Sequence, residues 1–223
     1  MKKGFIIVIE GSTDGVGKSK QTELLYERLV KDGYDVITHH FPTYNTYHGA
    51  FVEKYLKGEY GNKEKLSPYF INSLYAIDRA VVWHTKLKEA YKDGKIILLD
   101  RYTSSSIIYQ SAYLKGKAKK DFIDYISDYE HNKLETKRPD MMIFLTAPFE
   151  LLSELREKRN KKKNSFKDIH EIDTEYLKKV YDSSIFIAKY LNWNIIECSE
   201  KKKIRSIEDI HEEIYNLVKK KIK

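Results

Sequence analysis

The 223-residue sequence has few of the features that mark several classes of protein. Its one cysteine, Cys198, excludes an intramolecular disulfide framework and suits a reducing compartment, so we expect a cytoplasmic protein with this thiol in the core. The longest apolar runs, Phe5–Ile9 and Met141–Leu145, are far shorter than the roughly 18 residues that span a bilayer. With four prolines and ten glycines, the sequence has no long linker, and we expect a single domain over residues 1–223.

Arginine is also scarce, with 7 among 41 basic residues against 34 lysines, although the formal net charge is +8. Such a charge fits a nucleic-acid binder, a protein that handles phosphorylated small molecules, or a lysine-rich solvated surface. The lysines are scattered over every predicted helix and do not gather among aromatic residues, so we expect neither a nucleic-acid nor a membrane partner. The seven histidines have no spacing typical of a metal site.

Short apolar runs alternate with amphipathic segments along the whole sequence. The runs typical of buried strands are Phe5–Ile9, Asp35–Phe41, Lys95–Asp100, Met141–Thr146 and Trp193–Cys198. Helices are predicted from Lys18 to Asp32, from Ser67-Pro68, after Tyr102, over Leu151–Arg159 and from Ser206. Strands separated by helices imply a three-layer α/β fold, with a five-stranded parallel sheet and helices on both faces.

A glycine-rich segment, Glu10–Ser19, lies between the first strand and the first helix. The phosphate-loop pattern G-x-x-x-x-G-K-[ST] expects glycine where Ser12 stands, so either a serine opens the loop or the loop is one residue longer. A glycine-rich turn without a ligand is the alternative. Backbone N–H groups of such a loop cradle phosphates, its lysine reaches the β- and γ-phosphates, and its hydroxyl meets Mg²⁺. We therefore expect a P-loop NTPase fold, with ATP bound by Gly15, Val16, Gly17, Lys18, Ser19 and Lys20.

Two further pairs suit a second ligand. Asp100 and Arg101 close the third strand, where a carboxylate can hold the Mg²⁺ shell and a guanidinium can clamp a phosphate, unless they form an ordinary ion pair. Tyr75 and Arg79 are four residues apart and share a helix face. An aromatic ring beside a guanidinium can stack on a base and donate to its carbonyl, although a surface cation–π pair has the same spacing.

Four motifs in order resemble the thymidylate kinase family. Asp100-Arg101-Tyr102-x-x-Ser105-x-x-x-Tyr109-Gln110 resembles its D-R-Y-x-x-S-x-x-A-Y-Q signature, with Ile108 in place of alanine. The phosphate loop resembles E-G-x-D-G-x-G-K-S-x-Q with one inserted residue, His40–Thr43 resembles the turn after the second strand, and Leu74–Arg79 resembles L-[FY]-x-x-[DN]-R. The chain departs at Tyr44–Thr46, where family members often have an arginine or a Gly-Gly-Thr run. The resemblance covers Phe5 to about Val218.

This resemblance implies transfer of the γ-phosphoryl group of ATP to dTMP, giving ADP and dTDP, by a homodimer with Mg²⁺ near Ser19 and Asp100. For the base, it implies that Tyr75 stacks on thymine, that Arg79 meets its O4, and that Ser105 and Gln110 lie near the base edge. For the sugar and phosphates, it implies that Tyr109 lies beneath the sugar, that Asp14 meets the 3′-hydroxyl or assists at the phosphates, and that Arg101 holds the acceptor phosphate. Phe41-Pro42 would form the floor of the pocket. The alternative is another nucleoside-monophosphate kinase or a deoxynucleoside kinase. A nucleoside acceptor needs a carboxylate near the end of the second strand, where this chain has Phe41-Pro42.

Charge on the migrating phosphoryl group must come from outside the phosphate loop, because Gly15 follows Asp14 where some family members have a basic residue. We expect a lid over about residues 156–172 to supply it through Arg156 and Arg159, with Lys161–Lys163 as diffuse attraction, unless these are solvated helix residues. The family's D-R-x-E run corresponds to Asp168–Glu171, with Ile169 in place of arginine. The predicted catalytic residues are Asp14, Lys18, Arg101 and Arg156.

Overall fold

The five predicted strands form one parallel sheet in the computed structural model, which describes residues 3–62, 65–162, 174–201 and 203–222. They are β1 (Phe5–Gly11), β2 (Val36–His40), β3 (Ile96–Asp100), β4 (Met141–Thr146) and β5 (Asn194–Glu197). Their order is β2-β3-β1-β4-β5, and every pairing is parallel. The predicted sheet is confirmed. β4 has the predicted bounds, and the other four strands differ from the prediction by one or two residues at their ends.

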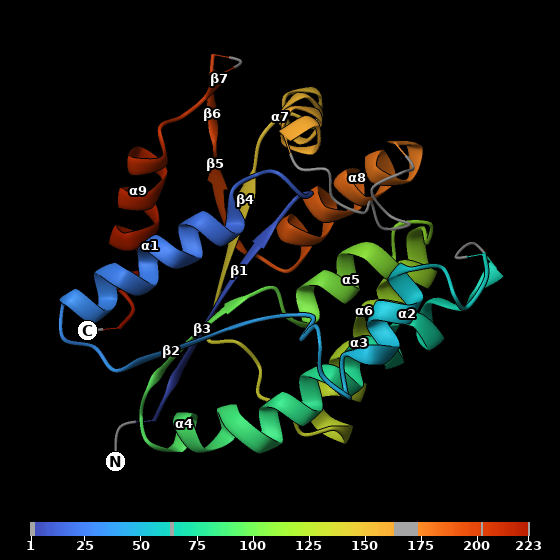
Figure 1. The fold of residues 1–223 in the computed structure, drawn as a ribbon, viewed down its shortest axis with the longest axis horizontal. Helices are drawn as coiled ribbons and strands as arrows, with labels where there is room; N and C mark the ends of the chain where they lie inside the picture. The colour runs from blue at the N-terminus through green and yellow to red at the C-terminus, as the bar shows by residue number, and fades with distance from the viewer. Residues whose placement is uncertain (1–2, 63–64, 163–173, 202, 223) are drawn as a thin grey trace.

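Helices cover both faces of this sheet, which confirms the three-layer arrangement (Figure 1). On one face lie α1 (Lys18–Lys31) and α9 (Ile207–Lys219). On the other lie α3 (Pro68–Val82), α4 (Lys88–Lys92), α5 (Thr103–Gln110), α6 (Gly116–Asp128) and α8 (Thr174–Tyr190). The remaining elements are α2 (Ala50–Leu56), which packs on α3, α7 (Phe149–Lys162), the π-helical turns η2 (Trp83–Leu87) and η3 (Tyr129–Lys133), and a hairpin of β6 (Ser199–Glu200) and β7 (Lys203–Ile204).

The central strand shows why its sequence is apolar without alternation. Ile7 and Ile9 pack into the core beneath α1 and α9, whereas Ile6 and Val8 pack into the core on the α3 side. All four side chains are almost completely buried, and each such burial stabilises the fold by about 1.5–3 kcal/mol. Because both faces of β1 are covered, packing fixes the position of this strand, and the loop after it begins at the carboxyl ends of the strands.

The predicted starts of α1, α3, α5 and α9 are also confirmed, whereas α7 begins at Phe149, two residues before the predicted Leu151. Ser67 caps α3 by accepting a hydrogen bond from the backbone N–H of Tyr69, with Pro68 at the first helical position. Ser206 caps α9 by accepting from the N–H of Asp209. Cys198 is buried, as expected. Helices α2, α6 and α8 lie in segments for which the sequence patterns predicted no helix.

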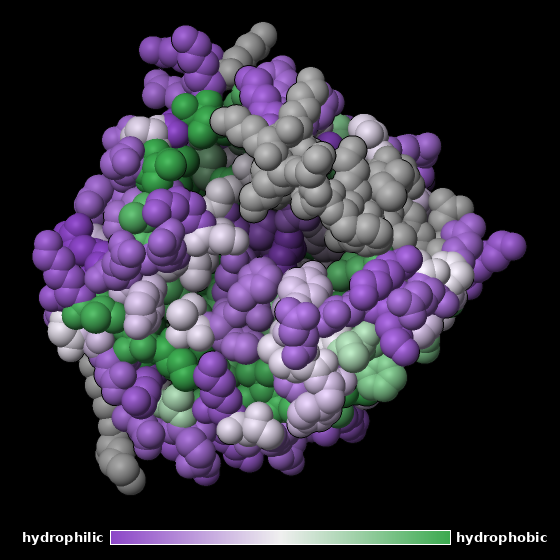
Figure 2. Space-filling view, in the orientation of Figure 1, coloured by the Kyte–Doolittle hydropathy of each residue, from purple (hydrophilic) through white to green (hydrophobic). Residues whose placement is uncertain are grey.

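Hydrophilic residues cover most of the molecular face drawn in Figure 2, and its apolar residues form small separate groups. Lys119 of α6 does not belong to the solvated surface: its side chain is buried against α8, and its Nζ donates to Ser183 Oγ at 2.7 Å. Burial lowers the pKa of Lys119. None of the helices that the structure describes is both long and apolar enough to span a membrane.

Candidate active site

The loop between β1 and α1 begins at Ser12. Gly11 is the last residue of β1 and pairs with Leu145, and the backbone N–H of Ser12 donates to the carbonyl of Leu145 at 2.9 Å. A serine therefore stands at the start of the loop, where the sequence pattern expects glycine. Gly17 precedes α1 with φ 96°, a left-handed conformation that L-residues with side chains rarely adopt. The unpaired N–H groups at the start of α1 consequently face the loop.

Lys18 lies back over this loop. Its side chain is 6% exposed, and its Nζ donates to the carbonyl of Thr13 at 3.4 Å and to Asp14 Oδ1 at 3.3 Å. Both contacts are long for hydrogen bonds of a charged amine, which are strongest near 2.8 Å. The ammonium group is thus buried, loosely held and close to the loop backbone, where an anion could replace Asp14 as its partner.

Ser19, Asp100 and His40 meet at the carboxyl ends of β2 and β3. Ser19 Oγ donates to Asp100 Oδ2 at 2.7 Å, and His40 Nδ1 lies 3.2 Å from the same oxygen. Burial favours a raised pKa for Asp100, but the hydrogen bonds from His40 and Ser19 and the charge of Lys18 outweigh it and lower the pKa to about 2. Asp100 is therefore ionised at neutral pH.

The other oxygen of Asp100, Oδ1, is buried without a hydrogen-bond partner in the described part of the chain. A carboxylate oxygen with a free lone pair beside a serine hydroxyl is a donor set that fits Mg²⁺, which binds oxygen ligands and keeps several waters. Within residues 3–62, 65–162, 174–201 and 203–222 no group of three or more His, Cys, Asp or Glu could hold a metal alone. A metal here would need ligands from a bound nucleotide and water.

Arg101 is held between two carboxylates. Its guanidinium pairs with Asp14 and lies 3.6 Å from Glu10 Oε1, and it also lies over the ring of Tyr109. Burial would lower the pKa of Arg101, but Asp14, Tyr109 and Glu10 raise it well above its usual value. The backbone of Arg101 has φ 68°, a left-handed conformation that is unfavourable for residues with a side chain. Strained conformations of this kind cluster at functional sites.

Glu10 is completely buried at the end of β1 and orders the start of α5. Its Oε2 accepts from Ser104 Oγ at 2.9 Å and from Ser105 Oγ at 2.5 Å, while its Oε1 accepts from the N–H of Gly11. The same carboxylate therefore supports Arg101 and Ser105, two predicted ligand contacts.

Arg79 lies in a buried network at the base of α3. Its Nε and Nη2 donate to the two oxygens of Glu130 at 2.6 and 2.7 Å, and Nη2 also donates to Ser106 Oγ at 2.8 Å. Arg79 is 1% exposed and Glu130 is completely buried. Most donors of this predicted base contact are therefore taken by protein. Nη1 is loosely engaged, since its one hydrogen bond to the described residues is a 3.5 Å contact with the carbonyl of Tyr102.

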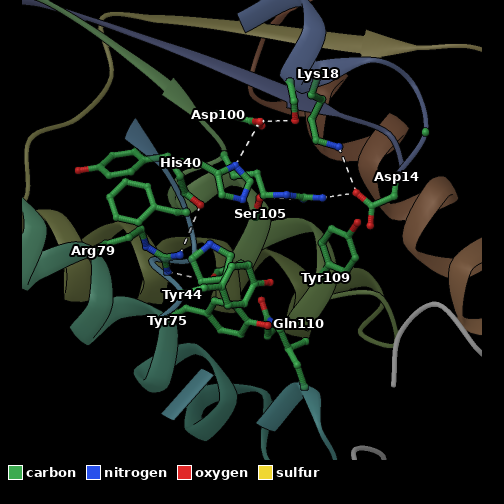
Figure 3. A pocket seen from close by; sticks show the side chains of 18 of the residues that line it. Asp14, Lys18, His40, Tyr44, Tyr75, Arg79, Asp100, Ser105, Tyr109 and Gln110 are labelled. Carbon is green, nitrogen blue, oxygen red and sulfur yellow. Dashed lines mark hydrogen bonds and ion pairs between the residues drawn. The ribbon is translucent and has the colours of Figure 1, made fainter. Parts of the chain in front are cut away.

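One cavity of about 480 Å³ joins these groups. In Figure 3, Asp14, Lys18 and Asp100 lie at one end, and Tyr44, Tyr75 and Gln110 lie at the other. All nine predicted dTMP contacts line it: Asp14, Phe41, Pro42, Tyr75, Arg79, Arg101, Ser105, Tyr109 and Gln110. Of the predicted ATP and metal contacts, Gly15, Gly17, Lys18, Ser19, Lys20 and Asp100 line it as well. Gln110 Oε1 has no hydrogen-bond partner among the described residues.

Val16 and Arg156 lie outside this lining. The Val16 side chain is buried in the core beneath α1. Arg156, on α7, is 6% exposed, its Nη2 donates to Ser153 Oγ at 3.4 Å, and its Nη1 is buried without a partner among the residues described. A methyl group at Gly15 would lie 3.8 Å from the backbone nitrogen of Arg156, so α7 packs directly on the phosphate loop.

Several predicted lid residues lie outside the described structure. Arg159, Lys161 and Lys162 belong to α7, but their side chains are not described. Lys163, the Asp168–Glu171 run and the rest of the predicted lid to residue 172 fall in the gap between residues 162 and 174.

Five polar residues that organise the pocket had no role predicted from the sequence: Glu10, His40, His48, Asp78 and Glu130. Glu10, His40 and Asp78 stand inside the motifs, so their positions were a usable signal. Glu130 offered no signal, because it is 51 residues from Arg79 and only the fold brings them together.

Comparison with known proteins supports the motif reading. The family model described as thymidylate kinase matches residues 9–214. A probable thymidylate kinase from Thermococcus onnurineus is 33% identical, over 96% of this chain and 97% of its own length. One from Thermococcus gammatolerans is 31% identical, over 98% of each. The solved structure of a thymidylate kinase from Candida albicans superposes with a TM-score of 0.72 at 22% identity, over 98% of this chain and 92% of that one, and so shares the fold.

Proposed function

Because this chain belongs to the thymidylate kinase family, we propose that its pocket transfers the γ-phosphoryl group of ATP to dTMP, giving ADP and dTDP. The observation that carries this proposal is the single cavity, in which a phosphate loop at one end faces an aromatic and guanidinium end at the other. A protein that only bound ATP would need no such second end.

At the donor end, the loop from Ser12 to Gly17 and the start of α1 bind the ATP phosphates. Lys18 leaves Asp14 and pairs with the β- and γ-phosphates, which its long contacts of 3.3 and 3.4 Å support. Ser19 and Asp100 would hold Mg²⁺, since the buried Oδ1 of Asp100 has no hydrogen-bond partner in the described structure. The metal supplies positive charge at the phosphates when it is bound.

At the acceptor end, thymine stacks on Tyr75 and presents its polar edge to Arg79 and Gln110. Oε1 of Gln110, which no described residue bonds, can accept from a base N–H, and the loosely engaged Nη1 of Arg79 can donate to a carbonyl. Arg101 holds the dTMP phosphate and orients its oxygen toward the γ-phosphorus. Because that oxygen is already anionic, the transfer needs no strong general base.

Arg156 supplies charge to the migrating phosphoryl group. Its Nη1 has no hydrogen-bond partner among the described residues and lies on a helix that packs on Gly15, which supports this role. We extend the same proposal to Arg159 and to a lid over about residues 156–172, within a single domain of residues 1–223. A buried guanidinium with an unmet donor is stabilised when an anion arrives.

We further propose a cytoplasmic homodimer. On α3, Tyr69, Phe70 and Ile77 are exposed by 41%, 43% and 42%, and Tyr69 packs edge-on against Phe122 and Tyr125 of α6. A second copy covering this face would remove these apolar groups from water. Sedimentation of the wild type should give twice the chain mass, and Ile77→Glu should shift it to the monomer.

A coupled ADP-release assay tests the activity with dTMP, dUMP, dCMP, dGMP and thymidine as acceptors, each with ATP and Mg²⁺. We expect the highest kcat/KM with dTMP and no turnover without Mg²⁺. Turnover on thymidine without turnover on dTMP would instead indicate a deoxynucleoside kinase.

A further inference from the structure

The loop of residues 41–49 connects β2 to α2 and forms one wall of the pocket. It contributes Phe41, Pro42 and Tyr44 to the lining. Tyr44 stands in the stretch where the resembled family often has an arginine, and it is 46% exposed. A loop of this length needs specific contacts to hold one conformation, because each ordered residue loses backbone entropy.

Asp78 provides those contacts from α3. Its Oδ2 accepts from the backbone N–H of Thr43 at 2.8 Å, and its Oδ1 lies 2.7 Å from His48 Nδ1. Since a carboxylate oxygen accepts, Nδ1 carries the proton. The Asp78 side chain is 1% exposed and that of His48 is 11% exposed, so water competes little for either bond.

The loop is folded tightly between these two points. Thr46 Oγ1 donates to the carbonyl of Thr43 at 2.7 Å and accepts from the N–H of Gly49 at 3.1 Å. A methyl group at Gly49 would lie 1.9 Å from the carbonyl oxygen of Thr43, so only glycine permits this approach. His39 Nε2 lies 3.0 Å from Thr43 Oγ1, and burial together with the charge of Lys86 lowers the pKa of His39 to about 4, so this ring is neutral.

The same helix holds the other wall. Tyr75 and Arg79 line the pocket from α3, and Asp78 is the neighbour of Arg79 in sequence. One carboxylate therefore fixes the spacing between the 41–49 loop and the helix that carries Tyr75. A ligand ring between the two walls would meet a slot whose width is set before binding, which lowers the entropy lost on binding.

We propose that Asp78 and His48 are positioning residues for the acceptor nucleotide. They touch neither substrate, and they act by holding Pro42 and Tyr44 opposite Tyr75 so that the base enters a preformed slot. This inference rests on the proposed function, since it names residues that serve its acceptor end.

The decisive variant is His48→Ala, because His48 lies at the outer end of the network, whereas loss of the Asp78 carboxylate beside Arg79 threatens folding. We expect the KM for dTMP to rise about tenfold, as for the loss of one buried hydrogen bond to a charged group. The KM for ATP and kcat should stay within about twofold, since the hydrogen-bond partners of His48 in the described structure, Asp78 and Thr46, lie outside the phosphate loop.

His48→Asn is the rescue variant, because the amide nitrogen of asparagine takes the place of Nδ1 and can donate to Asp78. Its KM for dTMP should return to within about threefold of the wild type. His84→Ala is the matched control, since it removes a histidine that bonds the carbonyl of Leu134 away from the pocket. It should leave both KM values unchanged.

The outcomes separate the two proposals. A wild type without dTMP turnover defeats the proposed function. An active wild type with an unchanged KM for dTMP in His48→Ala overturns the positioning role, as does an equal rise in both KM values. A variant His48→Asn as impaired as His48→Ala, with His84→Ala normal, would show that the hydrogen bond to Asp78 is not what holds the slot.

Discussion

The phosphate end of the pocket and its aromatic end draw on different lengths of chain. Residues 14–20 line most of the phosphate end, to which β2 adds His40 and β3 adds Asp100. The aromatic end combines the 41–49 loop, α3 and α5, and it depends on the Arg79–Glu130 pair, whose members are 51 residues apart. The phosphate end depends on a backbone conformation that the local sequence determines. The aromatic end depends on side chains that tertiary contacts hold in place. We therefore expect mutations within residues 14–20 to stop chemistry with little change in stability, and mutations behind the aromatic end to affect both chemistry and stability.

Lys18→Ala should have the largest effect, and it tests the phosphate end of the pocket. Removing the charge from the β- and γ-phosphates should lower kcat by about 10³-fold, or about 4 kcal/mol of transition-state stabilisation. The melting temperature should stay within a few degrees of the wild type. Coupled ADP release and calorimetry provide the two readings, and a variant that keeps a tenth of its kcat would place the essential charge elsewhere.

Glu130→Met tests the tertiary contacts behind the aromatic end. It leaves the guanidinium of Arg79 buried without its main partner, which should lower the free energy of unfolding by about 3 kcal/mol in a denaturant titration. The double variant Arg79→Met with Glu130→Met should recover much of that loss but raise the KM for dTMP. Glu175→Met, which breaks an exposed pair with Lys179, is the control and should change stability by less than about 1 kcal/mol. Equal stability of Glu130→Met and Glu175→Met would show that the Arg79–Glu130 pair does not stabilise the fold.

The pH dependence of the free energy of unfolding tests the lowered pKa of Asp100 at the phosphate end. Its folded-state pKa of about 2 lies below the unfolded value of 3.8, so its ionised form stabilises the fold above about pH 4. That stabilisation, about 2 kcal/mol, is lost as the pH falls toward 2. Asp100→Asn should therefore be less stable than the wild type at pH 7, with the difference shrinking toward pH 2. Denaturant titrations at several pH values measure it, and a pH-independent difference would contradict the lowered pKa.

Arg156→Ala should have the smallest effect of these changes, about tenfold on kcat, because we assign part of the same charge to Arg159. The KM for ATP should change less than kcat. An unchanged kcat would make Arg156 a structural residue of α7, and the phosphate end would then be complete without a lid arginine.

The contrast between the two ends also explains what could be predicted from the sequence. The strands, the phosphate loop and its Lys18 follow from local patterns, and the motifs gave all nine predicted acceptor residues, which line one cavity. The sequence did not reveal that Arg79 is buried against Glu130, or that Asp78 bonds the 41–49 loop through Thr43 and His48. A hydrogen bond between residues 30 to 51 positions apart has no periodicity, so it becomes visible only in the fold.

The most direct test of a pocket with two separate ends is a calorimetric titration of Tyr75→Ala with dTMP and, separately, with a non-hydrolysable ATP analogue. Stacking of a base on an aromatic ring is worth about 1–3 kcal/mol, so the Kd for dTMP should rise about tenfold or more. The Kd for the ATP analogue should stay within about twofold, and Tyr113→Ala, which alters a tyrosine outside the cavity lining, should change neither. An unchanged Kd for dTMP in Tyr75→Ala, or an equal loss of both ligands, would contradict the assignment of the aromatic end to the acceptor.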